Sequence, residues 1–458
     1  MSFLPEMLKS LHLDIDPETA AKQIVNQQHY PSFFDVSGLA ASSFLALGEA
    51  LRSLLSCQYP AMTPTLEIDQ RLASLWFDRS LHLIDGSRPT GWDQIAGDYR
   101  CANGWIRLHT NAPHHKAAAL KVLQVPENRD MVANAVSTCE GQALETAIVT
   151  AGGCAAQMRS LEDWAVHPQG HAVRQEPLLD WSIGPEKARG RFSIGDPQRP
   201  LNGLKVLDIT RVIAGPVATR ALAGFGANVL RIDPEHWHEP ALFEELTIGK
   251  RCAHLNLQDK SDKQIFLALV AEADVLIHGL RGDALSKLDL SIDRLRTVNP
   301  ALIDVAHNAY GWTGPWANRR GFDSLVQMSA GIAAFGMKAA DAQKPLPLPV
   351  QALDHATGYL VAAAAIMAIK SATEQNRAVS VRTSLARVGW LLSQTAKLEM
   401  RGQVAPATPS DFCAEIEQTN IGDALRLEPA IRIEAIPQYW SMPARPLRSA
   451  SPVWRDIN

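Results

Sequence analysis

The most informative carboxylate of the chain is Asp354, which begins an almost wholly apolar helical stretch that has Gly358 one turn further on. An aspartate in this place commonly caps its helix. A carboxylate held against an apolar helix is also the setting of a partly desolvated nucleophile, which needs no base because its ordinary pKa is about 3.9. The spacing alone favours the cap and leaves nucleophilic catalysis as the second role.

A second feature is the turn Ala214-Gly215-Pro216, which follows the apolar run at 204–209. Small residues let a ligand approach the backbone, and proline fits the first turn of a helix. The crevice above the strand ends of a parallel sheet is where such folds bind ligands. Only Gly215 stands where a dinucleotide-binding loop has three glycines, so no such site is expected. A tight turn needed only for packing is the equal alternative.

The remaining candidates favour structural roles. His109, His114 and His115 form a local cluster, but no carboxylate or cysteine joins them at metal-ligand spacing, so no metal site is predicted. Cys154 follows two glycines and is read as a small buried residue. The six cysteines are scattered without a CxxC pair, which argues against a disulfide scaffold and favours a reducing cytoplasm.

Composition limits the class of protein. The 458 residues are 46% hydrophobic and 20% charged, as in soluble globular proteins. With 44 basic and 48 acidic residues, the chain has no basic excess for a nucleic-acid partner. The amino terminus lacks the pattern of a secretory signal, and the apolar run at 359–369 is shorter than the ~20 residues of a membrane span. We therefore expect a cytoplasmic enzyme of two or three domains with no membrane partner.

Helical and strand patterns alternate after a Gly- and Pro-rich stretch at 184–200. Short apolar runs predict buried parallel strands, and amphipathic segments between them predict covering helices. The strands are expected at 204–209, 229–232, 252–257, 273–280 and 301–310, and the helices at 216–222, 262–272 and 358–369. The fold class is therefore α/β, with a Rossmann-like parallel sheet.

The part of the chain before this stretch has a different pattern. Residues 36–55 and 66–82 are predicted to be helices, and 98–110 a hairpin that turns at Asn103-Gly104. Helices at 113–123, 128–138 and 141–152 complete a smaller α+β unit. The predicted domains are a helical segment 1–85, a small α+β domain 86–183, a linker 184–200, a Rossmann-like domain 201–400 and a C-terminal tail 401–458.

Two segments near the chain ends resemble each other. FDVSGLAASSFLAL (34–47) resembles DHATGYLVAAAAIM (354–367), and LEIDQRLASL (66–75) resembles VSVRTSLARV (379–388). The spacing between the two blocks differs by seven residues, which a loop absorbs at small entropic cost. The pattern is that of a helical element duplicated within the chain, with a chance match of two apolar helices as the alternative.

Several longer stretches resemble the family III CoA-transferases, a family that also includes the α-methylacyl-CoA racemases. The resemblance runs through LNGLKVLDITRVIAGPVATRALAGFGANVLRID (201–233), GKRCAHLNL (249–257), ADVLIHGLRGDAL (273–285), the segment 299–331 and LDHATGYLVAAAA (353–365). Residues 98–175 resemble the family's small domain more loosely. In the family that domain follows the nucleotide-binding half, so the order here is permuted, as a trimmed tandem duplication would leave it.

The resemblance implies roles for individual residues. It places the nucleophile on Asp354, and in the amino-terminal copy it places Phe34 there, beside Asp35, which implies a catalytically dead copy. The CoA contacts it implies are Val212, Ile213, Ala214, Lys250, Leu280, Arg281 and Arg320. The sequence departs from the family at Pro234, where an arginine is common, and at Gly279-Leu280, where an Asn-aromatic pair is usual. Arg281 is then a substitute charge.

The resemblance also implies an activity and an assembly. CoA would pass from an acyl-CoA to an acceptor carboxylic acid through an acyl-aspartyl anhydride and an aspartyl-CoA thioester, without a permanently bound cofactor. The family forms interlocked homodimers with the active site between large and small domains, so residues 90–183 are expected near Asp354. A racemase is the rival within the family, although Phe322 stands where racemases have a histidine. A non-catalytic acyl-CoA-binding protein is the rival from another class.

Overall fold

A seven-stranded sheet forms the centre of the molecule in a computed structural model that describes residues 3–186, 192–400 and 402–455. The strand order is β10-β9-β8-β11-β12-β13-β7, and all neighbours are parallel except the edge pair β13 and β7. This is the strand order of a doubly wound Rossmann-type sheet with one added edge strand. The strands are β7 (Asp180–Glu186), β8 (Lys205–Ile209), β9 (Asn228–Asp233), β10 (Lys250–His254), β11 (Val275–His278), β12 (Ile303–Asn308) and β13 (Arg377–Ser384).

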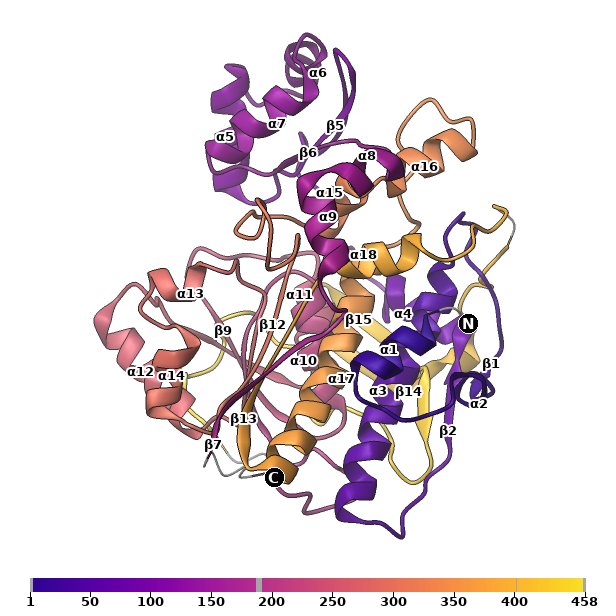
Figure 1. Cartoon of the computed structure of the whole chain (residues 1–458), viewed down its shortest axis with the longest axis vertical. Helices are drawn as coiled ribbons and strands as arrows, with labels where there is room; N and C mark the ends of the chain where they lie inside the picture. Colours follow the sequence, from indigo (N-terminus) through magenta and orange to yellow (C-terminus); the bar gives the residue numbers. More distant parts are fainter. Residues whose placement is uncertain (1–2, 187–191, 401, 456–458) are drawn as a thin grey trace.

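Helices cover both faces of this sheet (Figure 1). Along β8, Leu207 packs with α12 on one face, whereas Val206 belongs to the larger core with α10 and α17 on the other. The alternation follows from the two-residue period of a strand. The helices of this half are α10 (Ala214–Gly224), α11 (Phe243–Leu246), α12 (Lys260–Glu272), α13 (Ala284–Lys287), α14 (Ile292–Val298), α15 (Asp323–Ser329), α16 (Ile332–Ala339), α17 (Ala352–Gln375) and α18 (Leu385–Ser393).

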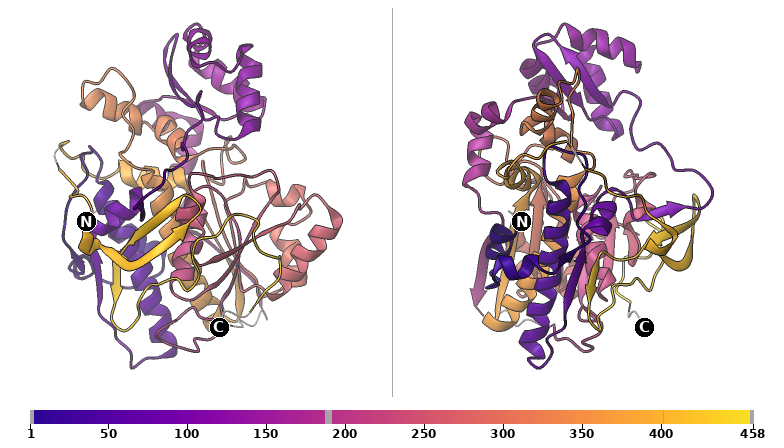
Figure 2. Two further views of the ribbon diagram at one scale, coloured as in Figure 1. Left: turned by 180° about the vertical axis from the view of Figure 1, so that it is seen from behind. Right: turned by 90° about the vertical axis from the view of Figure 1, so that its right-hand side faces the viewer.

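The small α+β unit lies at one end of the molecule, above α15 and α16 (Figures 1 and 2). The predicted hairpin forms, but it turns at Ala102–Asn103, one residue before the predicted Asn103-Gly104 turn, and the core of the unit is a separate apolar cluster around Ile106. Its elements are β4 (Gly97–Cys101), β5 (Gly104–Leu108), α5 (Pro113–Leu123), α6 (Arg129–Ser137), α7 (Gly141–Thr150) and β6 (Ala155–Gln157), and the connecting helices are α8 (Leu161–Val166) and α9 (Pro168–Gln175).

The boundary after the small unit differs from the prediction. Strand β7 runs to Glu186 and pairs antiparallel with β13, so residues 180–186 belong to the large sheet rather than to the small unit or a linker. Residues 187–191 of the predicted linker lie outside the described residues. Strand β7 forms by pairing with β13, where Arg377 is the register partner of Glu186. Because this partner lies far along the chain, the local sequence pattern at 180–186 does not predict it.

The amino-terminal segment contains α1 (Leu4–Ser10), α2 (Pro17–Ala21), β1 (Ile24–Val25), α3 (Val36–Gln58), β2 (Leu66–Asp69), α4 (Gln70–Asp78) and β3 (Leu81–Leu83). The prediction of one helix over 66–82 is wrong at both ends. Residues 66–69 form a strand between β1 and a C-terminal strand, because Leu66 and Ile68 point to the core with period two.

The internal similarity corresponds to a repeated order of elements. Helix α3, strand β2 and helix α4 follow one another as α17, β13 and α18 do. Phe44 of α3 packs on Tyr359 of α17, with ring centroids 4.0 Å apart. By length and composition α3 and α17 are apolar enough to cross a membrane, but 89% and 100% of their most apolar windows are buried inside the protein. Their apolar surfaces form the core of the molecule.

The C-terminal segment is not an extended tail. It contains the 3-10 helix Pro409–Asp411, β14 (Phe412–Thr419), β15 (Gly422–Leu427) and β16 (Ile431–Ile433). Strand β15 pairs with β3, and β16 pairs with β2, both antiparallel. The last described part returns to the large sheet, where Ala450 bridges to Ala253 of β10. The two chain ends therefore complete small sheets together.

Candidate active site

The order of the central sheet reverses between β8 and β11, where neighbouring strands connect to opposite sides. Doubly wound sheets bind ligands in the crevice at the carboxyl ends of the strands at this switch point. The residues that follow β8 include Val212, Ile213 and Ala214, and those that follow β11 are Gly279, Leu280 and Arg281. The topology therefore brings two sequence-predicted groups to the same end of the sheet.

Asp354 lies in the first turn of α17, with only 8% of its surface exposed. Burial and the neighbouring charge of Asp323 raise the pKa of the Asp354 carboxyl well above its ordinary value, and the backbone N–H of Ala214 opposes that shift. The cap that the sequence favoured is not formed, because α17 has no side-chain cap of its own at Gln351. The Asp354 side chain thus faces the turn after β8.

Asp323 contacts Asp354, and the sequence analysis did not identify it as a site residue. It begins α15, is fully buried, and its Oδ2 accepts the backbone N–H of Asp354 at 2.9 Å. Its Oδ1 accepts a short hydrogen bond from the Gln327 side chain. Burial raises the pKa of Asp323, and the donated hydrogen bonds oppose that rise. The available signal was its place after Phe322 in the family-like motif at 321–323.

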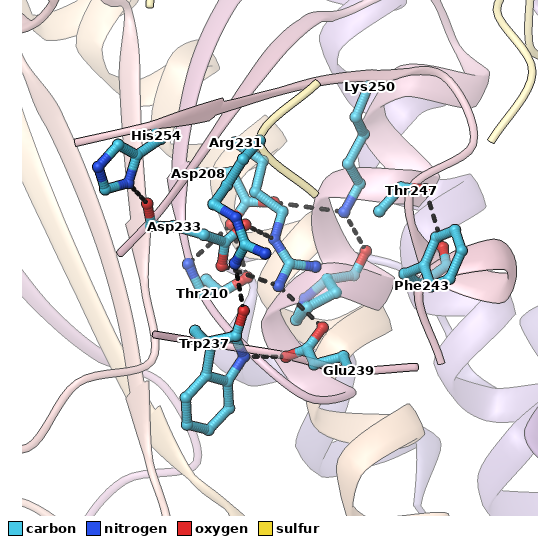
Figure 3. Close-up of polar contacts among 12 residues, drawn as sticks. Asp208, Thr210, Arg231, Asp233, Trp237, Glu239, Phe243, Thr247, Lys250 and His254 are labelled. Atoms are coloured by element: carbon cyan, nitrogen blue, oxygen red, sulfur yellow. Dashed lines mark hydrogen bonds and ion pairs between the residues drawn. The ribbon is translucent and has the colours of Figure 1, made fainter. Parts of the chain in front are cut away.

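The turn after β8 is strained and tied to a carboxylate. Val212 has φ +67°, a region that β-branched residues rarely adopt. Its N–H donates to Glu239 Oε1 at 2.6 Å, and Trp237 Nε1 donates to the same oxygen at 2.7 Å. The buried Arg231 donates to Glu239 Oε2 at 2.8 Å (Figure 3). Strain of this kind persists where the surroundings hold it, and it is frequent at functional sites.

Two glycines allow close packing around the start of α10, and one of them, Gly358, sets how closely α17 approaches it. A Cβ on Gly358 would lie 2.5 Å from the carbonyl oxygen of Ala214 and 2.8 Å from Val217 Cβ. A Cβ on Gly215 would lie 2.3 Å from Thr210 Cβ, so Gly215 makes room for the chain itself rather than for a ligand. At Gly215 the small residue therefore serves packing, as the alternative for the 214–216 turn stated. Ala214, in contrast, faces Asp354.

Lys250 does not reach the crevice. Its side chain is fully buried, and Nζ donates to Pro216 O at 2.8 Å and Thr219 Oγ1 at 2.5 Å, with Asp208 Oδ2 at 3.3 Å (Figure 3). Burial lowers the pKa of Lys250 to about 8, and the charge of Asp208 opposes the shift. With three acceptors from its own chain, this ammonium has no free donor direction for a CoA phosphate. The expected phosphate contact is replaced by a structural one that anchors α10.

The other predicted basic residues remain near the surface. Arg281 is half-buried, and its Nε lies 3.5 Å from Asp283 Oδ1. Arg320 is exposed. Burial and the charge of Arg320 lower the pKa of His115 in the small unit, so this guanidinium lies at the junction of the two parts of the molecule. Leu280 is half-buried and packs at the edge of the α12 core.

The small unit contacts the segment that leads into Asp323. The ring of His109 stacks on Phe322, with centroids 3.7 Å apart and planes 9° apart. Burial lowers the pKa of His109 to about 3, so this imidazole is neutral. Arg319 Nη2 donates to Glu145 Oε1 at 2.8 Å, which adds an ion pair between the loop and α7. The small unit is thereby fixed one residue away from the partner of Asp354.

The remaining candidates have structural environments. Cys154 is buried, lies 3.6 Å from His115 Nε2, and burial raises the pKa of its thiol to about 12. In the amino-terminal copy, Asp35 caps α3 by accepting the Gly38 N–H at 2.9 Å. The described residues contain no group of three His, Cys, Asp or Glu side chains that could hold a metal ion. A cavity of about 350 Å³ beside Lys205 and Asp274 lies at the opposite ends of β8 and β11.

Comparison with known proteins relates this chain to enzymes of CoA metabolism. The chain is 32% identical over 194 residues to the acetyl-coenzyme A transferase nodX of Hypoxylon pulicicidum, which covers 41% of this chain and 33% of that protein. It is 33% identical over 188 residues to a probable fatty acyl-CoA transferase of Mycobacterium tuberculosis, covering 38% and 47%. It is 33% identical over 148 residues to the acetyl-CoA:oxalate CoA-transferase of Acetobacter aceti, covering 30% and 38%.

The similarity extends over part of each protein. The chain spans between 33% and 47% of the length of these three relatives. A crystal structure of the mycobacterial protein aligns with a TM-score of 0.39 at 30% identity, over 43% of this chain and 58% of that one. The model of CoA-transferase family III matches residues 201–413, which hold the central parallel strands, the turn after β8 and Asp354. Over residues 201–413, just under half of its length, this chain is similar to CoA-transferase family III.

Proposed function

We propose that the protein is a CoA-transferase that moves CoA from an acyl-CoA thioester to a carboxylic acid, with Asp354 as the nucleophile. The observation that carries the proposal is the buried carboxyl of Asp354 at the switch-point crevice, facing the Ala214 backbone N–H. A buried carboxylate lacks the water shell that makes carboxylates weak nucleophiles. The match of the surrounding residues 201–413 to the model of CoA-transferase family III supports this assignment.

The first half of the proposed reaction transfers the acyl group to the enzyme. A carboxylate oxygen of Asp354 attacks the thioester carbonyl, the carbon–sulfur bond breaks, and the CoA thiolate leaves an acyl-aspartyl anhydride. The thiolate then attacks the Asp354 side-chain carbonyl and releases the donor acid as its carboxylate. The Ala214 N–H and the start of α10, which has no side-chain cap, are the donors placed to stabilise negative charge there.

The second half reverses these steps with a new acid. The acceptor carboxylate attacks the aspartyl-CoA thioester, which gives a second anhydride and a free CoA thiolate. The thiolate attacks the acceptor carbonyl, so the acceptor leaves as its CoA thioester and Asp354 is regenerated. The bridging oxygen of the second anhydride comes from the acceptor and stays on Asp354.

We assign CoA to the crevice at the carboxyl ends of β8 and β11. Val212, Ile213 and Ala214 follow β8, and Leu280 and Arg281 follow β11, so these are the residues that we propose for CoA contacts. Arg320 at the small-unit junction is the exposed cation proposed for a phosphate. No permanently bound cofactor is part of the proposal, because the carboxylate and the thioester supply all the chemistry.

A cytoplasmic homodimer completes the proposal. All six cysteines are free thiols, which suits a reducing compartment. The homodimer follows the family resemblance, and light scattering on the purified chain tests it by giving the mass of the assembly.

The decisive experiment follows CoA and oxygen together. The protein is incubated with a panel of acyl-CoA thioesters and free carboxylic acids, and new thioesters are identified by mass. With an acceptor labelled in both carboxylate oxygens with oxygen-18, one heavy oxygen should enter the peptide that contains Asp354. Transfer without label in that peptide would exclude Asp354 as the covalent nucleophile.

Variants separate the chemistry from the fold. Asp354→Ala and Asp354→Asn should abolish transfer and leave folding intact. Asp35→Ala is the matched control, since Asp35 precedes the repeated helix α3 in the amino-terminal copy and should affect stability by only ~1 kcal/mol as a lost cap. Transfer by Asp354→Ala within a few-fold of the original rate would remove the assignment.

The raised pKa of Asp354 favours a second candidate, an acyl-CoA-binding protein without turnover. A carboxyl that stays protonated is not a nucleophile, because its lone pair is shared with the proton. In that case calorimetry would show acyl-CoA binding, while the panel would show neither new thioesters nor labelled Asp354. Measurements at increasing pH distinguish the candidates, because ionising Asp354 restores transfer only in an enzyme.

A racemase is tested in the same incubation. His109 places an imidazole on Phe322, but its pKa near 3 leaves it without a proton to donate at neutral pH. Incorporation of solvent deuterium next to the thioester carbonyl, with loss of that exchange in His109→Ala, would favour the racemase.

A further inference from the structure

Helix α17 begins without a cap from its own segment, and the cap is supplied by another helix. Gln351 at its start makes no side-chain cap, whereas Asp323 of α15 accepts the backbone N–H of Asp354 at 2.9 Å. The backbone of Leu353 also donates to Asp323. The end of α17 that carries the proposed nucleophile is therefore held by a carboxylate from elsewhere in the chain.

The surroundings of Asp323 require it to accept hydrogen bonds. Its second oxygen accepts from the Gln327 side-chain amide, and Gln327 Oε1 accepts the Leu348 N–H at 2.7 Å, which sets the orientation of that amide. Every partner of Asp323 named here is a donor, so the ionised form is the one that these contacts stabilise. Asp323 is fully buried, and its charge therefore acts at close range on its neighbour.

Few charges face this pair of carboxyls. From the small unit, Arg107 of β5 acts on Asp323, but its Nη1 is already bound to Asp98 at 2.7 Å. From α10, only the Ala214 backbone N–H acts on Asp354. From α17 itself, His355 is neutral because burial lowers its pKa to about 3. The repulsion between the two carboxylates is thus only partly compensated.

We propose that Asp323 is a positioning residue for Asp354: it holds the Asp354 backbone in place and sets a second negative charge against the nucleophile. This inference rests on the proposed function. When Asp354 attacks a thioester, its charge leaves as the CoA thiolate, and the repulsion from Asp323 is relieved. An interaction that is unfavourable before the attack and absent after it lowers the barrier. The cost is that Asp354 ionises only at higher pH.

The pH profile of transfer tests this proposal. For the original protein, kcat/KM should rise with pH as Asp354 loses its proton. Asp323→Asn keeps an oxygen for the Asp354 N–H but removes the charge, so the rise should move to lower pH and the plateau should fall by about tenfold. Asp304→Asn, a buried carboxyl on β12, is the matched control and should leave the profile unchanged.

A second variant changes the charge on Asp323 and leaves the buried pair intact. Arg107→Gln removes the cation that lowers the pKa of Asp323, so less of the Asp323 charge is set against Asp354 and the rise should begin at lower pH. If both variants transfer CoA and their kcat/KM rises at the same pH as in the original protein, the proposed role of Asp323 is wrong. If Asp323→Asn does not fold, Arg107→Gln alone decides the point.

A readout without turnover separates this inference from the proposed function. The difference in unfolding free energy between the original protein and Asp354→Asn should depend on pH, since the folded state holds the Asp354 proton more tightly than the unfolded state. In an Asp323→Asn background that dependence should shrink. Failure of transfer with this coupling present contradicts the proposed function alone. Absence of the coupling contradicts the role of Asp323.

Discussion

The backbone N–H of Val212 donates to Glu239 Oε1 at 2.6 Å, across a turn that places Val212 at φ +67°. Glu239 is itself held by the fully buried Arg231. The buried ion pair of Glu239 and Arg231 therefore stabilises the strained turn, and it fixes the position of the neighbouring Ala214 N–H. The acyl chemistry proposed at Asp354 depends on this turn, because the Ala214 N–H that follows it acts on the Asp354 carboxyl.

Glu239→Gln should lower kcat/KM by about tenfold, because the neutral amide no longer pairs with Arg231 and the Val212 turn can relax. Glu245→Gln is the matched control. Glu245 is also a buried carboxylate, and it accepts a hydrogen bond of 2.6 Å from Arg220 rather than from the Val212 turn. Both variants should lose stability in chemical denaturation, but only Glu239→Gln should lose turnover. Equal kinetic losses in both would contradict the role of Glu239.

Gly358→Ala should disrupt the approach of α17 to α10, because its Cβ would lie 2.5 Å from Ala214 O, a backbone atom that cannot rotate away. We expect a loss of about 1–3 kcal/mol in unfolding free energy and a loss of transfer.

Gly389→Ala is the matched substitution in α18, where a Cβ would find Leu353 at an ordinary contact distance of 3.4 Å. There the helix should gain up to ~1 kcal/mol. Normal transfer by Gly358→Ala would show that α10 and α17 do not need this approach for function.

Phe322→Ala removes the stacked contact with His109 and should loosen the small unit over the crevice. Water then reaches the anhydride, so the ratio of thioester hydrolysis to CoA transfer should rise. Both products are measured by mass in one reaction. Phe412→Ala, which removes a ring contact with His82 outside the site, should leave the ratio unchanged. A ratio that stays constant in Phe322→Ala would exclude a shielding role.

Lys250→Met and Arg320→Ala should differ in how they affect CoA binding. Lys250 is buried with acceptors from its own chain. Lys250→Met should therefore lower the unfolding free energy by about 3–5 kcal/mol, because the buried Asp208 charge loses its partner. The salt dependence of CoA affinity should stay unchanged. Arg320→Ala should weaken binding by about 1–3 kcal/mol, with a loss that shrinks as salt rises. Calorimetry at two salt concentrations checks both, and the reverse pattern would restore Lys250 as the phosphate contact.

Lys250 also predicts a pH dependence of stability. Its pKa is lowered from 10.5 to about 8 in the folded protein, so between these values the unfolded chain holds a proton that the folded chain has released. Unfolding free energy contributed by this residue should therefore rise with pH across that window. The difference between the original protein and Lys250→Met, measured by denaturation from pH 7 to pH 10, should rise accordingly. A flat difference would contradict the lowered pKa.

The sequence predicted the parts of the fold that depend on local periodicity. Apolar runs at 204–209 and 229–232 became β8 and β9, and the Asn-Gly turn became the hairpin of β4 and β5. These elements follow from the two-residue and 3.6-residue periods of their side chains. The motif around Asp354 was also visible, because its carboxylate stands out at the head of an apolar stretch.

Tertiary structure decided which polar residues meet. Asp323 and Asp354 are 31 residues apart along the chain, and Glu239 is 27 residues from Val212, so no spacing rule links them. Residues 66–69 became a strand because β16, from the other end of the chain, pairs with them. The family resemblance implied Lys250 as a CoA contact, and the sequence alone does not show that the fold buries its side chain. Hydrogen bonds and desolvation depend on what lies within a few ångströms, and only the folded chain determines that distance.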